Sequence, residues 1–207
     1  MYNDVTGLLL SGGKSARMGV NKSLLKIGER TVIEIMVSLL KPVFSNIYLI
    51  TNDPEEYSFL GIPAFTDIYP GKGPLAGIHS GLSHSVTERN FIISCDIPLM
   101  KREMINYLID YPTDKPIVIA RAGGFIQQLC GVYKKSCLLS AEEILKEDAA
   151  NEERNSEQKK RGCRVLELVN RAGAEIIEAE RLPFYDNDMY LNMNRKEEFE
   201  YVKQKLQ

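Results

Sequence analysis

Short runs of apolar residues alternate along the chain with longer segments in which apolar residues recur every three or four positions. The short runs have the length of β-strands, and the first does not alternate with polar residues, which is typical of a strand buried on both faces. The predicted strands are Thr6–Leu10, Asn46–Thr51, Ile62–Thr66, Phe91–Cys95, Ile117–Arg121 and Gln128–Tyr133. The predicted helices are Val32–Lys41, Leu75–Ser85, Lys101–Tyr111 and Ser136–Glu147.

This alternation of strands and helices predicts an α/β fold with a mostly parallel sheet and helices on both faces. No repeat or linker interrupts the pattern, so we expect a single three-layer, doubly wound, Rossmann-like domain over residues 1–207. In such folds ligands bind beyond the carboxyl ends of the strands. The segment Asn151–Arg161 has no apolar residue and predicts a solvated excursion. Its basic residues Lys159, Lys160 and Arg161 could instead guide an anionic substrate.

The composition is that of an ordinary globular protein, with 44% hydrophobic and 26% charged residues and a formal net charge of -2. A protein that wraps nucleic acid usually carries a basic excess, so we expect no nucleic-acid partner. The N-terminus lacks the basic start and apolar stretch of a signal peptide, and no apolar run is long enough to span a bilayer. We therefore expect a cytoplasmic protein without membrane contact.

Cysteine and histidine usage limits the kinds of site that the chain can build. The four cysteines form no CxxC pair, and Cys95 and Cys130 lie in apolar runs, which favours buried, reduced thiols. The two histidines are too few for a histidine metal cage. Any bound metal should therefore be a hard cation held by oxygen ligands.

The stretch Ser11–Lys22 is the richest in candidate chemistry. Paired glycines, Gly12 and Gly13, follow the first predicted strand directly and let the backbone present N–H groups to an anion. Arg17 and Lys22 add positive charge suited to a triphosphate or a pyrophosphate leaving group. Neither the P-loop spacing GxxxxGK[ST] nor the dinucleotide spacing GxGxxG is present.

Two acidic residues stand at the ends of predicted strands. Asp67 precedes a Gly-Pro turn and a predicted helix, and its carboxylate could accept hydrogen bonds from guanine or from a ribose hydroxyl. Asp96 closes the buried strand Phe91–Cys95 and is our candidate Mg²⁺ ligand, because Mg²⁺ needs only one or two carboxylates beside phosphate oxygens. Asn194 is predicted to cap a C-terminal helix, with Glu197 at the third helical position.

The pattern Leu-x-Gly-Gly-x-Ser-x-Arg-Met-Gly-x-x-Lys, from Leu10 to Lys22, resembles the signature of the nucleotidyltransferases that activate sugars and cofactors. It is most similar to that of the molybdenum cofactor guanylyltransferases. The resemblance extends to Asp67 with Gly-Pro-Leu-Ala-Gly-Ile, to Cys95-Asp-Ile-Pro98, and to the closing Asn192-Met-Asn194. It implies the nucleotide-diphospho-sugar transferase-like fold and transfer of GMP from GTP to the phosphate of molybdopterin, with release of pyrophosphate.

The resemblance also implies roles for individual residues. Catalysis falls to Arg17, Lys22 and Asp96, with Asp96 as ligand of the Mg²⁺ cofactor, and Asn192 and Asn194 face the second substrate. The implied nucleotide contacts are Leu10, Ser11, Gly12, Gly13, Lys22, Asn52, Asp67 and Asp96. The expected partners are GTP and molybdopterin, with transient contact to other molybdenum cofactor proteins, for a monomer or weak homo-oligomer.

Other functions share parts of this pattern. A nucleotidyltransferase that uses CTP, or a sugar phosphate as acceptor, would have the same motifs except at the base. A nucleotide-binding regulatory protein could have the same fold without catalysis. A dinucleotide-dependent oxidoreductase is disfavoured by the glycine spacing.

Overall fold

The computed structural model describes residues 1–12, 21–154 and 164–207. The strands are β1 Tyr2–Leu10, β2 Lys26–Ile27, β3 Arg30–Thr31, β4 Phe44–Ile50, β5 Ala64–Phe65, β6 Arg89–Ser94, β7 Ile117–Ala122, β8 Phe125–Lys134 and β9 Ala174–Glu178. The α-helices are α1 Val32–Leu40, α2 Pro74–His84, α3 Arg102–Asp110, α4 Cys137–Arg154, α5 Arg164–Ala172 and α6 Lys196–Leu206. Short 3₁₀ helices are η1 Lys22–Leu24, η2 Pro54–Leu60 and η3 Ala179–Arg181.

The main sheet has seven strands in the order β5-β4-β1-β6-β8-β7-β9. Every neighbouring pair is parallel except the two that involve β8, which is antiparallel to both β6 and β7. The predicted α/β fold with a mostly parallel sheet is therefore confirmed. β8 differs from the others because a hairpin, and not a helix, joins it to β7.

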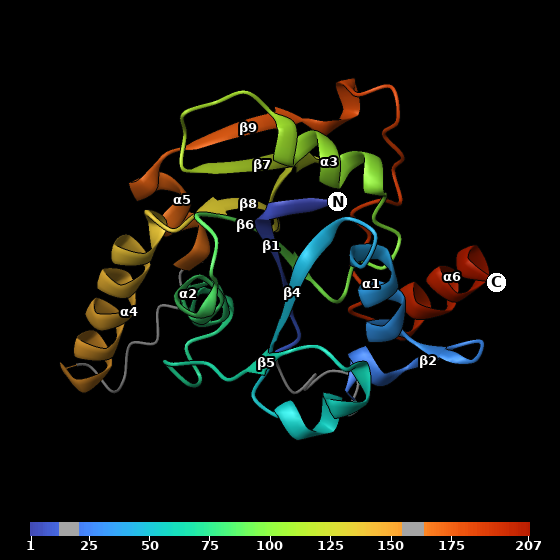
Figure 1. The fold of residues 1–207 in the computed structure, drawn as a ribbon, viewed down its shortest axis with the longest axis horizontal. Coiled ribbons are helices and arrows are strands. Elements are labelled where there is room, and N and C mark those ends of the chain that lie inside the picture. Colours follow the sequence, from blue (N-terminus) through green and yellow to red (C-terminus); the bar gives the residue numbers. More distant parts are fainter. Residues whose placement is uncertain (13–20, 155–163) are drawn as a thin grey trace.

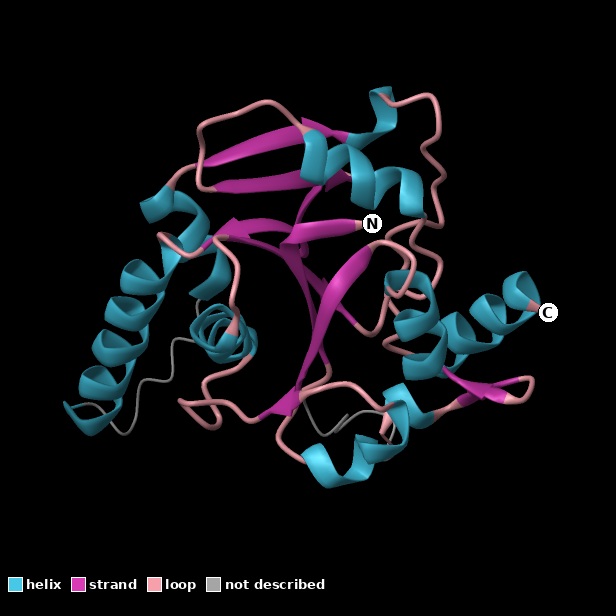
Figure 2. Ribbon diagram, in the orientation of Figure 1, coloured by secondary structure: helices cyan, strands magenta, loops and turns pink. Residues whose placement is uncertain are grey.

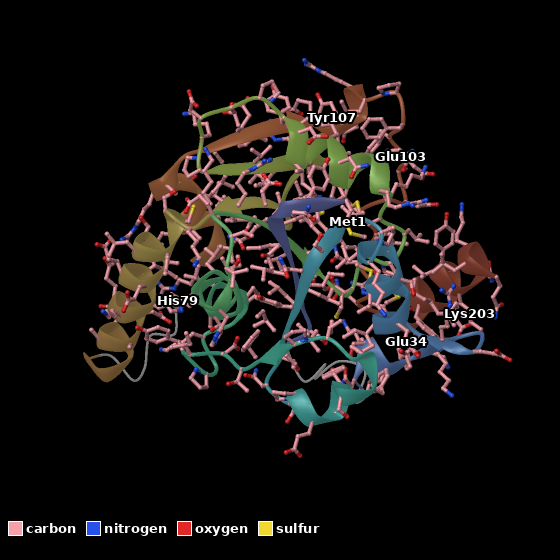
Figure 3. The ribbon with its side chains drawn as sticks, viewed as in Figure 1. Met1, Glu34, His79, Glu103, Tyr107 and Lys203 are labelled. Carbon is pink, nitrogen blue, oxygen red and sulfur yellow. The ribbon has the colours of Figure 1, made fainter. Side chains whose placement is uncertain are left out.

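Helices cover both faces of this sheet (Figure 1). On one face, α1, α3 and η2 bury an apolar cluster that includes Ile33, Met104 and Leu60. On the other face, α2, α4 and α5 pack against the sheet through residues such as Ile78 and Ile144. Figure 2 shows the resulting three layers, with strands between two groups of helices, and Figure 3 shows side chains filling the space between the layers.

The C-terminal helix α6 lies beside α1 and the β2–β3 hairpin (Figure 1). A third, smaller apolar cluster joins these elements through Ile27, Val32, Met193, Phe199 and Val202. The last segment of the chain is thus fixed against residues near its beginning. Among the described residues, no helix combines the length and hydropathy that a transmembrane span requires.

The charged segment begins differently from the prediction. Helix α4 does not end near Glu147 but continues to Arg154, so the first four residues of Asn151–Arg161 are helical and not an excursion. Glu and Arg favour helices and Asn is tolerated in them. An absence of apolar residues therefore does not end a helix by itself. Lys159, Lys160 and Arg161 lie outside the described residues.

Candidate functional site

The parallel strands β5, β4, β1 and β6 bring a row of candidate residues to one edge of the sheet. Asp67, Asn52, Ser11 and Asp96 follow these four neighbouring strands in that order. With about 4.8 Å between adjacent strands, the row is about 14 Å long. Strand β1 has β4 on one side and β6 on the other, so the chain order reverses there, as it does at ligand sites of open α/β sheets.

Ser11 begins the glycine-rich stretch and is held by the sheet. Its N–H donates to the carbonyl oxygen of Ile50 at 2.9 Å, and the carbonyl of Leu10 accepts from the N–H of Cys95 at 3.0 Å. Gly12 is exposed, and a Cβ added there would meet no atom of the described residues within 4 Å. The amide of Ser11 is already used by the sheet, so its contact with a nucleotide stays a prediction.

Gly13 and Arg17 lie outside the described residues. The remainder of the stretch resumes at Asn21, which caps η1 by accepting a hydrogen bond from the N–H of Ser23 at 3.3 Å. Sequence reasoning missed this residue, although asparagine is a preferred N-cap and its position before Lys22 was a usable signal.

Lys22 meets the C-terminal tail at this edge. Its Nζ donates to Oδ1 of Asn194 at 2.9 Å, and the N–H of Met193 donates to the carbonyl oxygen of Asp96 at 2.9 Å. Residues that are 172 positions apart in the chain are therefore in direct contact. Asn192 is exposed, and its Nδ2 donates to the carbonyl of Tyr190. The C-terminal segment thus contacts Lys22 through the side chain of Asn194 and the main chain of Asp96 through Met193.

The side chain of Asp96 has the properties of a cation ligand. Its Oδ1 is buried and has no hydrogen-bond partner among the residues that the structure describes. A buried carboxylate oxygen without a donor is costly unless a ligand or cation compensates it. The amide oxygen of Asn194 already accepts a hydrogen bond from Lys22, which leaves the Asp96 carboxylate as the protein's donor at this point. A single carboxylate fits Mg²⁺, which keeps waters and phosphate oxygens in its shell.

A metal site made only by the protein is not found in residues 1–12, 21–154 and 164–207. No group of three or more His, Cys, Asp and Glu side chains is placed to hold an ion there. Asp96 would consequently need the oxygens of a bound phosphate to complete a cation site.

Asp67 lies at the other end of the row, next to Asn52. Burial raises the pKa of the Asp67 carboxyl, and a hydrogen bond from the Asn52 side chain partly offsets this rise. The N–H of Ile68 donates to Oγ of Ser80 on α2 at 2.8 Å, which fixes the backbone beside Asp67. The predicted Gly-Pro turn is present: Gly73 has φ 71°, a value that favours glycine, and Pro74 begins α2.

Cys95 is not a candidate nucleophile. Burial, together with a smaller contribution from the Asp96 carboxylate, raises the pKa of its thiol to about 12, so the thiolate is not formed at neutral pH. Cys95, Cys130 and Cys137 are free thiols; Cys130 is buried as predicted, whereas the surface of Cys95 as a whole residue is only partly buried. Cys163 lies outside the described residues.

The predicted cap of the C-terminal helix is wrong by one residue. The N-cap of α6 is Arg195, and Glu198, not Glu197, accepts hydrogen bonds from the N–H groups of Asn194 and Arg195 at 2.5 and 2.8 Å. The side-chain oxygen of Asn194 is engaged by Lys22 and does not cap the helix. Sequence reasoning missed Glu198 because the adjacent Glu197 satisfies the same spacing rule from Asn194.

Comparison with known proteins identifies the family. Residues 7–161 match the model of the MobA-like NTP transferase domain. The chain belongs to this family. A probable molybdenum cofactor guanylyltransferase from Carboxydothermus hydrogenoformans is 32% identical over 201 residues, 95% of this chain and 94% of the relative. A protein of the same name from Peptoclostridium acidaminophilum is 32% identical over 209 residues, 98% of this chain and 90% of the relative.

Solved structures with low identity share the fold of this MobA-like chain. The molybdopterin-guanine dinucleotide biosynthesis protein A of Archaeoglobus fulgidus has a TM-score of 0.78 at 18% identity, over 97% of this chain and 98% of that protein. The matched family region 7–161 contains Lys22, Asp67 and Asp96, whereas Asn192 and Asn194 lie beyond it. The contact between Lys22 and Asn194 thus joins the matched region to the C-terminal tail.

Proposed function

We propose that this MobA-like chain transfers GMP from GTP to the phosphate of molybdopterin and releases pyrophosphate. The observation that carries the proposal is the buried Oδ1 of Asp96, which has no partner in the described part of the chain and whose backbone carbonyl bonds to Met193, next to the Asn194 that Lys22 contacts. This arrangement offers one carboxylate and one ammonium group to a bound triphosphate. The names of the full-length relatives supply the nucleotide and the acceptor.

In the proposed reaction, an oxygen of the acceptor phosphate forms a bond to the α-phosphorus of GTP. The bond between the α-phosphorus and the bridging oxygen to the β-phosphorus breaks, and its electron pair leaves with pyrophosphate. The acceptor phosphate is already ionised at neutral pH, so no general base is needed. The protein contributes position and charge, which are the main sources of catalysis in phosphoryl-type transfers.

We place the two ends of the nucleotide at the two ends of the row of residues along the sheet edge. We assign the base and ribose to Asn52 and Asp67, and the phosphates to Lys22, Asp96 and the N–H groups near Gly12. We further assign Arg17 and Gly13 to the phosphates from the family pattern. Asp96 would hold Mg²⁺ together with oxygens of the bound phosphates, and we assign Asn192 and Asn194 to the second substrate. When bound, Mg²⁺ neutralises charge on the phosphate oxygens.

The proposal includes the setting in which the enzyme acts. We propose a single nucleotidyltransferase domain over residues 1–207, in the cytoplasm, as a monomer or weak homo-oligomer. Transient contact with other molybdenum cofactor proteins would deliver or remove the pterin.

The test is a pyrophosphate-release assay with GTP, MgCl₂ and molybdopterin, repeated with each component left out. We expect release only when all three are present. Isothermal titration with GTP, CTP and UTP identifies the base, and tightest binding of CTP would replace the guanylyl assignment by a cytidylyl one. Nucleotide binding without pyrophosphate release, with molybdopterin and with sugar phosphates, would support a regulatory protein instead.

A further inference from the structure

The hydroxyl group of Tyr57 is a buried junction at the base of the glycine-rich stretch. Tyr57 lies in η2, directly after β4, and only 3% of its surface is exposed. Three side chains approach its oxygen: Oγ of Ser11 at 3.2 Å, Nδ2 of Asn21 at 2.8 Å and Oγ of Ser23 at 2.8 Å. These partners come from both sides of the stretch that separates Ser11 from Asn21.

The Tyr57 hydroxyl uses its full hydrogen-bonding capacity within this network. A phenol oxygen accepts two hydrogen bonds and donates one. The Ser11 hydroxyl and the Asn21 amide are the two donors to Tyr57. The Ser23 hydroxyl donates to Oδ1 of Asn21 at 2.8 Å, so the proton of Tyr57 is directed to Ser23. A network in which every member is satisfied favours one arrangement of its members.

Two members of this network flank Lys22 in the sequence. Asn21 and Ser23 are the residues on either side of Lys22, and both bond to Tyr57. The remaining N–H of the Asn21 amide donates to Oε2 of Glu56, the residue before Tyr57, at 2.8 Å. The backbone at Lys22 is therefore attached to η2 from both sides, and its Nζ reaches Asn194 from that fixed position.

We infer that Tyr57 is a positioning residue that fixes Lys22 for the phosphates of the bound nucleotide. The Tyr57 hydroxyl ties Ser11, at the end of β1, to Asn21 and Ser23, and so sets where the Lys22 ammonium group stands. The inference rests on the proposed function, because Lys22 matters only if the site takes a nucleoside triphosphate. Tyr57 itself touches no reacting atom.

The test is the Tyr57→Phe variant, which keeps the ring in the core and removes only the hydroxyl. We expect its dissociation constant for GTP with Mg²⁺, measured by isothermal titration, to rise about tenfold, equivalent to about 1.4 kcal/mol. Tyr133→Phe is the matched control: Tyr133 is fully buried and its hydroxyl donates to the carbonyl of Gln128 at 2.6 Å. The control should lower the melting temperature by a similar amount but should weaken GTP binding less than twofold.

A double-mutant cycle tests whether Tyr57 acts through Lys22. Lys22→Gln keeps a long polar side chain, so that binding remains measurable at millimolar nucleotide. In that background Tyr57→Phe should change GTP affinity less than twofold, because the group that it positions is already gone. A further tenfold loss in the Lys22→Gln background would overturn the role through Lys22.

Two outcomes overturn the inference directly: a Tyr57→Phe affinity within twofold of wild type, or an equal loss in Tyr133→Phe. If Tyr57→Phe does not fold, Ser23→Ala removes one arm of the network and should weaken GTP binding at least threefold, and unchanged binding overturns the inference. If the wild-type protein binds CTP in place of GTP, the same variants are compared by their affinity for CTP. Wild-type protein that binds no nucleotide overturns the proposed function as well.

Discussion

Asp96 and Asp67 are both carboxylates that follow a parallel strand, yet their surroundings differ. Asp96 has a buried oxygen without a partner in the described part of the chain, whereas Asp67 receives a hydrogen bond from Asn52. An unpartnered buried oxygen is costly to folding, and such costs accumulate where a ligand compensates them. The two residues should consequently respond differently to mutation.

For Asp96 we predict a loss of activity without a matching loss of stability. Asp96→Ala should lower the rate of pyrophosphate release by about 10²-fold or more, since a charge-stabilising group is lost. The free energy of unfolding, from urea denaturation, should stay within about 1 kcal/mol or increase, because the unpartnered oxygen is removed. Asp53→Ala is the control, since Asp53 is exposed and its side chain makes no capping bond to η2. Near-normal turnover in Asp96→Ala would contradict its role as Mg²⁺ ligand.

For Asp67 we predict a pH-dependent gain in stability on mutation to asparagine. The folded protein raises the pKa of this carboxyl above 3.8, so the folded state holds its proton more tightly than the unfolded state. Its contribution to stability falls as pH rises from 3.8 through the higher folded pKa. Asp67→Asn should therefore have a higher melting temperature than wild type at pH 7, by a margin that shrinks towards pH 4. A difference in melting temperature that does not depend on pH would contradict a raised pKa of Asp67. The affinity of Asp67→Asn for GTP should be lower than that of wild type at pH 7.

At the scale of elements, the C-terminal residues Met193 and Asn194 are held at the site by apolar packing and by hydrogen bonds. Met193 is buried with Phe199 and Val202 of α6 against Ile27 and Val32. The neighbouring Asn194 bonds to Lys22 through its side chain and to Glu198 through its N–H. Apolar packing of α6 thus determines where a polar side chain of the site stands.

We predict that Glu198 supports the site through this tail. Glu198→Ala should lower the free energy of unfolding by about 1 kcal/mol, because two N–H groups at the start of α6 lose their acceptor. It should also reduce GTP affinity, since Asn194 loses one of its anchors. Glu197→Ala is the control, as Glu197 has the same charge in the same turn of the helix and is exposed. Equal effects of the two substitutions on affinity would show that only charge matters.

The elements that sequence reasoning predicted are those with long apolar patterns. The strand ends before Ser11 and Asp96 were located to within one residue because buried parallel strands read as continuous apolar runs. The strand before Asp67 was predicted over Ile62–Thr66 and is only Ala64–Phe65. The β2–β3 hairpin has strands of two residues and too short a pattern to detect. Strand β9 was missed as well, since its five residues, Ala-Glu-Ile-Ile-Glu, form neither a continuous apolar run nor a strict alternation, and it lies at a sheet edge.

The site itself was predictable only in part, for a related reason. Motif spacing located residues within one loop, such as Lys22, but a contact across 172 positions between Lys22 and Asn194 has no local signal. The Tyr57 junction is similar, because a tyrosine in an apolar segment reads as core until its hydroxyl partners are known.

At the scale of the whole molecule, the site depends on both faces of the sheet. Tyr57 belongs to the apolar cluster under α1 and α3 on one face of the sheet. On the other face, α2 packs in the second cluster, and its Ser80 accepts a hydrogen bond from the N–H of Ile68, next to Asp67. The two clusters share the seven strands between them. Disruption of either face should therefore disturb the same binding site.

This shared sheet predicts a single cooperative unfolding transition that bound nucleotide displaces as a unit. Calorimetry should give one peak with an enthalpy of about 0.7 kcal/mol per residue near 60 °C, or about 145 kcal/mol for the chain, equal to the van't Hoff value. GTP with Mg²⁺ at about 100 times its dissociation constant adds about 2.7 kcal/mol to the folded state and should raise the melting temperature by about 6 °C. ATP at the same concentration is the control and should give a smaller shift. Two peaks, of which only one moves with GTP, would contradict a single domain, because the nucleotide would then stabilise one part of the sheet independently of the other.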